Sequence, residues 1–247
     1  MLLKATTKSV LFYSSLFVLV AIIAIVVYVV IKGAINYNRI AACKTVPEGT
    51  FCGLQKIDLT IPEPLRRDIV GQVEKGVGKR VVIPKWKSGR TISTADVIAL
   101  VPQVFHWYKE LEGAISAIVG EQVFITSEQL PTTCSILVYE EDGDYINWHY
   151  DVNYFEGRFF TLLIPCTIAN SCTEYTYYDK HGTKQGLQTE IGKSILFEGD
   201  KVFHMATPFC NKGEKRVILS VQFSTNPTIN WFNRSLMRLK DIAYIGV

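Results

Sequence analysis

Three residues of this chain have side chains and spacing that could bind a metal ion: His149, Asp151 and His204. Side chains two positions apart in a strand point to the same face, so His149 and Asp151 can present an imidazole and a carboxylate together. His204 would supply a second imidazole. Two imidazoles and one carboxylate suit Fe(II) and leave coordination positions open for other ligands.

The chain has only four histidines, so the alternative ligand sets are few. We expect His106 to lie in a helix, where it packs or faces solvent. His181 lies in a polar, glycine-containing stretch that predicts a turn, and it would be a ligand only in place of His204. A structural zinc site would more often use thiolates, and the sequence has no Cys-x-x-Cys pair. A surface ion pair is the other interpretation of His149 and Asp151.

Lys215 and Arg216 form a basic pair about a dozen residues after His204. Adjacent strand residues face opposite sides, so one cation should point into the fold and the other outward. Ser220 and Gln222 have the same parity as Arg216, and together they would form a polar stripe. A guanidinium binds a carboxylate through two parallel hydrogen bonds, which an ammonium cannot do. We therefore favour Arg216 as a carboxylate-binding residue and keep Lys215 as the alternative.

The elements that would position these residues are predicted as helices first and strands afterwards. Apolar spacing predicts helices over 62–76 and 91–120, the second capped by Ser93 or Thr94 and kinked at Pro102. The basic stretch Lys79 to Arg90 reads as a loop. Short runs rich in β-branched and aromatic residues then predict strands at 123–126, 135–139, 159–164, 175–178, 194–197 and 216–223. Such a series of strands indicates a sandwich or barrel.

The N-terminus differs from the rest of the chain, because Val10 to Ile31 contains no charged residue. As a helix this run would span about 33 Å, enough to cross a bilayer. It exceeds the usual apolar core of a signal peptide, which is the rival interpretation. We therefore expect a single-pass membrane anchor. The net charge of +3 is small, so we expect no nucleic-acid partner.

Six cysteines favour an oxidising compartment, and hence a lumenal or exterior domain resembling those of the endoplasmic reticulum. Cys43 and Cys52 bracket one short loop, and Cys166 and Cys172 bracket another, so each pair could close a disulfide. The alternative is six free thiols in a domain that faces the cytosol.

Residues 134–224 resemble the double-stranded β-helix (jelly-roll) core of the Fe(II)/2-oxoglutarate-dependent dioxygenases, and in particular the prolyl-4-hydroxylase-like branch. The resemblance rests on an ordered set of residues: Tyr139, Gly143, Tyr145, His149, Asp151, Arg158, Thr161, Phe197, His204, Pro208, Gly213 and Arg216. H-x-D alone is a weak signal, but the complete set in this order is specific. Related enzymes often have a Tyr on the strand after Thr161, where this chain has Ile164-Pro165-Cys166. Pro165 should end or distort that strand.

The resemblance implies that Fe(II) binds His149, Asp151 and His204, with 2-oxoglutarate and O2 as co-substrates and ascorbate as a candidate additional cofactor. Arg216 would pair with the distal carboxylate of 2-oxoglutarate. Lys215 stays open here as well, because Gly213-Glu214-Lys215 is similar to the Gly-x-Lys of collagen-type prolyl hydroxylases.

Other residues have less specific expected roles in the same resemblance. Tyr139 would donate its hydroxyl to 2-oxoglutarate, or else be a core aromatic. Thr161 would line the same pocket. Arg158 would be structural or face the substrate, and Tyr154 and Phe155 in the 152–157 loop could stack on a proline ring.

The expected protein has a mainly β jelly roll with supporting helices, preceded by one transmembrane helix. Its expected segments are an anchor at 1–32, a stalk at 33–60 and a dioxygenase domain at 61–247, with helical support at 61–120 and a jelly-roll core at 121–225. The resemblance implies hydroxylation of a prolyl or lysyl side chain in a peptide, with release of succinate and CO2. The alternatives are a small-molecule or lipid hydroxylase, and an inactive jelly roll that only binds or supports.

Overall fold

The computed structural model describes residues 12–25, 27–28, 50–169, 172–210 and 213–245, with side chains of the last helix described at 231–237 and 241. The chain divides into two units, Met1–Arg39 and Ile40–Val247. Residues 12–25 of the first unit are helical. No helix among the described residues combines the length and the apolar character needed to cross a membrane. The predicted span 10–31 lies partly outside these residues, so it remains a prediction. The predicted stalk 33–60 lies outside them up to residue 49, but residues 54–58 form a strand of the sheet instead, so that part of the prediction is wrong.

The second unit is built on one curled sheet of twelve strands in which every strand pair is antiparallel. The order is β1-β10-β7-β12-β5-β3-β6-β11-β8-β9, with β2 paired to β3 and β4 paired to β12. The strands are β1 (Leu54–Asp58), β2 (Lys79–Ile83), β3 (Lys87–Ile92), β4 (Phe124–Ile125), β5 (Cys134–Tyr139), β6 (Tyr145–His149), β7 (Phe159–Pro165), β8 (Tyr175–Tyr178), β9 (Lys184–Leu187), β10 (Lys193–Glu198), β11 (His204–Ala206) and β12 (Arg216–Ser224). The prediction of a mainly β fold with supporting helices is confirmed.

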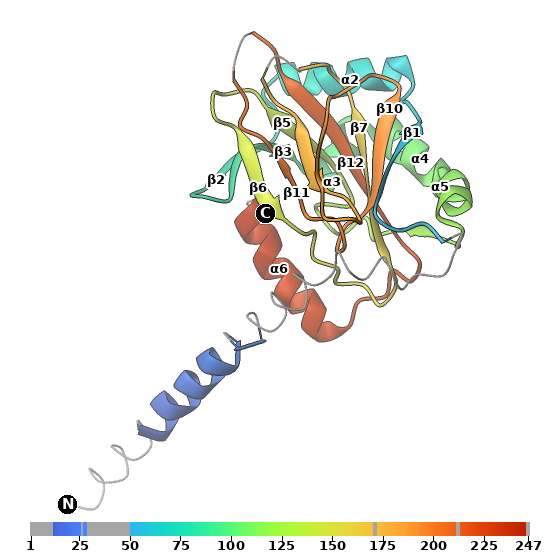
Figure 1. Ribbon diagram of the computed structural model, residues 1–247. Coiled ribbons are helices and arrows are strands. Elements are labelled where there is room, and N and C mark those ends of the chain that lie inside the picture. Colours follow the sequence, from blue (N-terminus) through green and yellow to red (C-terminus); the bar gives the residue numbers. More distant parts are fainter. Residues whose placement is uncertain (1–11, 26, 29–49, 170–171, 211–212, 246–247) are drawn as a thin grey trace, which may run out of the picture. The chain divides into compact units, whose positions relative to one another are not determined.

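Helices α2 (Glu63–Glu74), α3 (Thr94–Leu100), α4 (Pro102–Glu110) and α5 (Glu112–Val119) share one hydrophobic core with the outer face of the central strands. Ile69 and Tyr108 on the helices are fully buried there, as are Leu162 and Leu219 on β7 and β12. A further helix, α6 (Trp231–Ile245), follows the last strand. It lies opposite α4 and α5 in Figure 1. Burial of apolar side chains on one face is what fixes the strand registers.

The other face of the central strands lines a cavity, as the period-two alternation requires. On β12, Arg216, Ile218, Ser220 and Gln222 face the cavity, whereas the alternate residues pack under the helices. The polar stripe predicted on this strand therefore faces inward.

Two predicted elements were wrong. The stretch Lys79 to Arg90, predicted as a loop, forms most of the β2–β3 hairpin, in which Lys79 pairs with Thr91. The long helix predicted over 91–120 is three helices. Ser93 caps the first through a capping box, and Pro102 begins the second after Val101 leaves helical geometry. Proline has no N–H to continue a helix but fits the first turn of a new one, which explains the break.

The predicted Cys166–Cys172 disulfide is also wrong. Cys172 is bonded to Cys210 instead. Cys166 is a buried free thiol, as is Cys134. Cys166 directly follows β7, where its side chain packs in the hydrophobic core, so it cannot turn toward the exposed Cys172. Cys52 is disulfide-bonded, but Cys43 lies outside the described residues, so the Cys43–Cys52 pairing stays a prediction.

Candidate active site

A β-bulge places His149 at the cavity. His204 on β11 is opposite His149 on β6, but Ala206, two residues later, is opposite Ile146, three residues earlier. The extra residue on β6 interrupts the alternation, so Ile146 and His149 both line the cavity. Asn147 lies within the bulge, and its side-chain amide donates a 2.8 Å hydrogen bond to the Lys85 carbonyl. The β2–β3 hairpin therefore helps to hold the bulge.

His149, Asp151 and His204 meet at one point. Each can offer one ligand atom such that all three atoms lie within 4.8 Å of one another. Nδ1 of His149 is 2.7 Å from the Asn147 carbonyl, and Nδ1 of His204 is 3.0 Å from the Val202 carbonyl. A carbonyl only accepts, so both Nδ1 atoms carry the proton and both Nε2 atoms keep a free lone pair. The donor set therefore fits a metal such as Fe(II).

Thr161 on β7 holds the carboxylate of Asp151. Its hydroxyl donates a 2.8 Å hydrogen bond to Oδ2 of Asp151, whereas Oδ1 lies 3.6 Å from Nε2 of His149. Burial raises the pKa of Asp151, but its interactions with His149 and His204 and the Thr161 hydrogen bond lower it by more, to about 2. The carboxylate is therefore ionised, with Oδ1 directed toward the histidines.

His204 is buried among aromatic rings. It stacks on Tyr175 at 5.3 Å between ring centroids and meets the edge of Phe197 at 4.8 Å. Burial and the nearby His149 lower its pKa to about 4, although Asp151 opposes this. The imidazole is therefore neutral at physiological pH, which is the form that binds metals.

Gly199 allows the Asp151 backbone to approach the sheet. Its carbonyl accepts a 2.9 Å hydrogen bond from the Asp151 N–H. A Cβ at Gly199 would lie 2.7 Å from the Phe159 ring and 2.8 Å from the Asp151 Cβ. Only glycine fits between the Phe159 ring and the Asp151 Cβ. Gly199 therefore helps to determine the position of the Asp151 carboxylate in the cavity.

The triad opens into a cavity of about 200 Å³ that also contains Arg216. The Arg216 side chain is buried, and its Nη1 donates a 3.3 Å hydrogen bond to Oγ1 of Thr173. Its Nε has no hydrogen-bond partner among the residues that the structure describes. Lys215 instead points outward, and its Nζ lies 3.3 Å from Glu140. Arg216 is thus the member of the basic pair that is available to a ligand in the cavity.

No acidic residue in the described part of the chain pairs with Arg216. Burial lowers its pKa, and interactions with Tyr139 and Tyr175 partly oppose that shift. A guanidinium stays protonated in proteins, so the cavity holds a buried positive charge. A carboxylate ligand would neutralise this charge through charge-assisted hydrogen bonds.

Two tyrosines line the cavity beside Arg216. The Arg216 guanidinium lies 5.5 Å from the centre of the Tyr139 ring. The Tyr175 hydroxyl is buried without a hydrogen-bond partner among the described residues. Burial raises the pKa of both phenols, so both hydroxyls are neutral donors. Sequence reasoning proposed Tyr139 but missed Tyr175, although Tyr175 begins a strand that was predicted.

Lys87 on β3 is a second cavity residue that sequence reasoning missed. It is 5% exposed, and its Nζ donates a 3.0 Å hydrogen bond to Oγ1 of Thr91. Lys87 lies in the stretch predicted as a basic loop, where its charge suggested exposure. The sequence offered one signal for a cavity position: if this stretch is a strand, Lys87, Gly89 and Thr91 lie on the same face of it.

Other predicted residues lie away from the metal ligands. Arg158 binds the buried Glu198 through Nε and Nη2, at 3.1 and 2.9 Å, so its observed contacts are structural. His181 is exposed in the β8–β9 turn and does not belong to the cluster that contains His204. Tyr154 and Phe155 are buried in the cavity wall.

No family model and no curated protein matches this sequence. Solved structures do match its fold. A prolyl hydroxylase from Trichoplax adhaerens, in complex with a hypoxia-inducible-factor peptide fragment, is 12% identical, with a TM-score of 0.56 over 85% of this chain and 95% of that one. An oxidoreductase of the 2-oxoglutarate-Fe(II) oxygenase family from Burkholderia pseudomallei is 13% identical, with a TM-score of 0.54 over 79% and 94%.

The α-ketoglutarate-dependent epimerase SnoN from nogalamycin biosynthesis is 9% identical, with a TM-score of 0.56 over 70% of this chain and 76% of that one. The fold is that of the 2-oxoglutarate-Fe(II) oxygenases. Proteins with this oxygenase fold act on peptides and on small molecules.

Proposed function

We propose that this chain is an Fe(II)/2-oxoglutarate-dependent dioxygenase that hydroxylates a peptidyl substrate. One observation carries the proposal: a three-ligand cluster shares one cavity with a buried arginine that has no acidic partner in the described part of the chain. An inactive binding domain would have no chemical need for both. The oxygenase fold supports the same function.

Each residue has a defined role in this proposal. His149, Asp151 and His204 hold the metal through Nε2, Oδ1 and Nε2, and Arg216 holds the distal carboxylate of 2-oxoglutarate. When bound, the metal and 2-oxoglutarate would supply the oxidising chemistry. In the coupled reaction, O2 oxidises 2-oxoglutarate to succinate and CO2 and hydroxylates a C–H bond of the substrate. Tyr139 and Tyr175 offer neutral hydroxyl donors to the carboxylate. Apolar walls such as Ile218 exclude water from the cavity.

A peptide is the favoured substrate because the 152–157 loop brings aromatic side chains to the cavity. Phe155 packs on Phe159 at 5.5 Å between centroids, and both line the wall. Such rings form a surface on which a proline ring can stack. The structural neighbour from Trichoplax adhaerens is a prolyl hydroxylase in complex with a peptide. Met237 of α6 also lines the cavity and narrows it, which favours a small molecule as the second candidate.

Succinate formation tests the proposal. The wild-type protein, with Fe(II) and 2-oxoglutarate, should form succinate, and proline-rich peptides should stimulate it more than free amino acids or lipids. A His149→Ala, His204→Ala double variant should lose at least about 100-fold, because two ligands are gone. His181→Ala is the matched control, since His181 is exposed and is not one of the three cluster residues. Unchanged succinate formation in the double variant would exclude this function.

Attachment to a membrane through residues 10–31 is part of the proposal, with the catalytic unit in an oxidising compartment. The uncharged sequence supports the anchor, and the Cys172–Cys210 disulfide supports the compartment. Release of the intact protein from membranes by alkaline carbonate would contradict the anchor. Free thiols at Cys172 and Cys210 in protein isolated with alkylation would contradict the compartment.

A further inference from the structure

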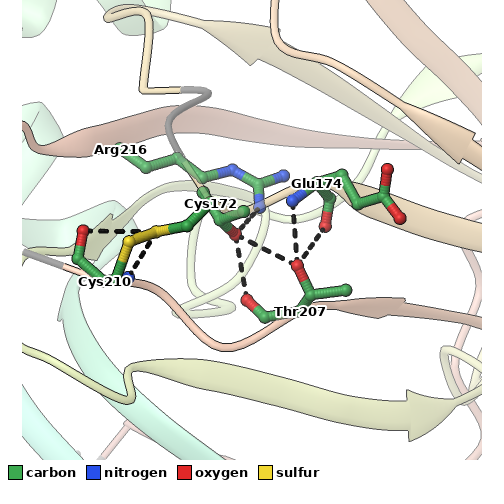
Figure 2. The surroundings of a disulfide bond; sticks show 6 residues. Cys172, Glu174, Thr207, Cys210 and Arg216 are labelled. Atoms are coloured by element: carbon green, nitrogen blue, oxygen red, sulfur yellow. Dashed lines mark hydrogen bonds between the residues drawn. A yellow bond between two sulfur atoms is a disulfide. The ribbon is translucent and has the colours of Figure 1, made fainter.

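The Cys172–Cys210 disulfide joins two segments that flank the candidate co-substrate site. Cys172 precedes β8, and Cys210 follows β11, with 5.9 Å between their Cα atoms. Figure 2 shows the bond beside Glu174, Thr207 and Arg216. The Cys210 N–H also donates a 2.9 Å hydrogen bond to Sγ of Cys172. Two loops that are distant in sequence are therefore fixed together.

Thr173, the residue after Cys172, continues this link into the interior. Its hydroxyl donates a 2.9 Å hydrogen bond to the Thr207 carbonyl. Next to it, the Glu174 N–H donates to Oγ1 of Thr207 at 2.9 Å, and the Thr207 N–H donates to the Glu174 carbonyl at 3.1 Å. The start of β8 and the end of β11 are thus tied by hydrogen bonds directly beside the disulfide.

The same Thr173 hydroxyl is the only hydrogen-bond acceptor that Arg216 has within the described residues. A hydroxyl has one hydrogen, and Thr173 gives it to Thr207, so a lone pair is left for the guanidinium. Arg216 approaches this lone pair at 3.3 Å, and both side chains are buried. The position of the cation therefore depends on Thr173, whose position depends on the two joined loops.

The disulfide is accessible from solvent, because the Cys172 side chain is exposed. The two free thiols differ, since Cys134 and Cys166 are fully buried. Burial raises the pKa of the Cys166 thiol to about 12, so it forms little thiolate for exchange. A reductant in solution can reach the Cys172–Cys210 bond without disturbing either core thiol.

We propose that Thr173 is a positioning residue for Arg216 and that the Cys172–Cys210 disulfide is a redox-controlled clamp on it. The inference rests on the proposed function, because it assigns Arg216 to the 2-oxoglutarate carboxylate. Reduction by a dithiol breaks the S–S bond, transfers two electrons and two protons to give two thiols, and oxidises the dithiol to its own disulfide. The two segments are then held only by hydrogen bonds, Thr173 is positioned less firmly, and the binding of 2-oxoglutarate weakens.

Calorimetric titration of 2-oxoglutarate into the full-length protein loaded with Mn(II) tests this clamp. Dithiothreitol should raise the Kd for 2-oxoglutarate about tenfold, the effect of losing one hydrogen bond to a charged group. The Kd for Mn(II), titrated separately, should change less than twofold, because the metal ligands do not contact the clamp. A Cys172→Ser, Cys210→Ser variant should show the weakened affinity without any reductant.

Two control variants isolate the clamp from other effects of reduction. Cys43→Ser, Cys52→Ser removes the remaining two cysteines of the sequence, and this variant should keep the full response to dithiothreitol. Thr173→Val keeps the disulfide but should raise the Kd for 2-oxoglutarate about tenfold. Reduction of this variant should raise that Kd by less than a further twofold, because the substitution and the reduction act on the same Thr173–Arg216 contact. Thr173→Ser keeps the hydroxyl and should bind 2-oxoglutarate like the wild type.

The outcomes separate this inference from the proposed function. Equal 2-oxoglutarate affinity with and without dithiothreitol overturns the clamp and leaves the dioxygenase assignment intact. Loss of Mn(II) and 2-oxoglutarate binding together on reduction also overturns it, because general loosening would then be the cause. No binding of 2-oxoglutarate to the oxidised protein rejects both proposals.

Discussion

Thr161 is the residue whose observed contact differs most usefully from its predicted one. The sequence placed it in the co-substrate pocket, and it does line the cavity. Its hydroxyl, however, is directed at the candidate metal ligand Asp151. A hydrogen bond to Oδ2 leaves Oδ1 as the oxygen that a metal would take, so we expect Thr161 to select the carboxylate oxygen that binds.

Thr161→Val should therefore lower metal affinity about 10- to 100-fold, because an outer hydrogen bond that orients a ligand is lost. Titration of Mn(II) followed by calorimetry would measure this Kd. Thr161→Ser retains the donor and is the matched control, with an expected Kd close to that of the wild type. Equal Mn(II) affinity in the valine variant would show that the sheet alone orients Asp151.

At this scale the sequence predicted residue types better than their contacts. The spacing of His149, Asp151 and His204 indicated a shared face, and the parity of β12 separated Arg216 from Lys215. The bulge in β6 could not be predicted, because it depends on hydrogen bonds from β11 and the β2–β3 hairpin. Tyr175 was missed because an aromatic residue in a strand is equally compatible with a core position.

The turn between β5 and β6 is organised by one buried carboxylate. Asp144 is 0% exposed and accepts hydrogen bonds from Arg80, Ser88 and the backbone N–H groups of Glu140 and Glu141. Burial raises its pKa, but these hydrogen bonds lower it by more. The pKa therefore lies below its ordinary value, and the carboxylate is ionised. The turn, the β2–β3 hairpin and the strand that carries His149 are thus joined through Asp144.

Asp144→Ala should reduce the free energy of unfolding by about 3 kcal/mol, because it leaves several donors without a partner. Urea denaturation would measure the change. Glu141→Ala provides the control, since Glu141 pairs with the same Arg80 at 2.9 Å but is 60% exposed. That variant should change stability by less than about 0.5 kcal/mol. Equal losses in both variants would contradict the importance of the buried contacts.

Elements were predictable where the local pattern and the tertiary environment agree. Each of the six predicted strands overlaps an observed one. Runs such as 216–223 are rich in the β-branched and aromatic residues that favour strands, and in the fold they are paired on both sides. The β2–β3 hairpin was missed because Lys79, Arg80 and Arg90 resemble a solvated loop. In the structure Arg90 is buried against Glu140, at 2.6 Å, and only the folded chain supplies that partner. Helix α6 was missed as well.

At the scale of the whole molecule, the neutral burial of His204 links stability to pH. In the metal-free protein its pKa is about 4, below the ordinary histidine value of 6.5. The unfolded chain then binds more protons between these two pH values, so stability falls as pH decreases from about 6.5 to 4. The lowered pKa of Asp151, about 2, extends the loss at still lower pH.

Thermal unfolding with EDTA should therefore show stability falling between pH 6.5 and 4, by an amount of about 3 kcal/mol from His204 alone. His204→Gln removes the titrating group and should flatten this part of the profile. A wild-type profile that is already flat over this range would contradict the neutral, buried state of His204.

The pairing of β1 with β10 has a consequence for the order of synthesis. Leu54 pairs with Phe197, and Asp58 pairs with Lys193. During synthesis β1 therefore stays unpaired until β10 has been translated. At about 5–20 residues per second, this wait lasts roughly 7 to 30 seconds on the ribosome. Lys56 and Asp58 are exposed charges on β1, and charges on an edge strand discourage pairing with other chains. The nascent chain thus has its own protection against aggregation until β10 emerges.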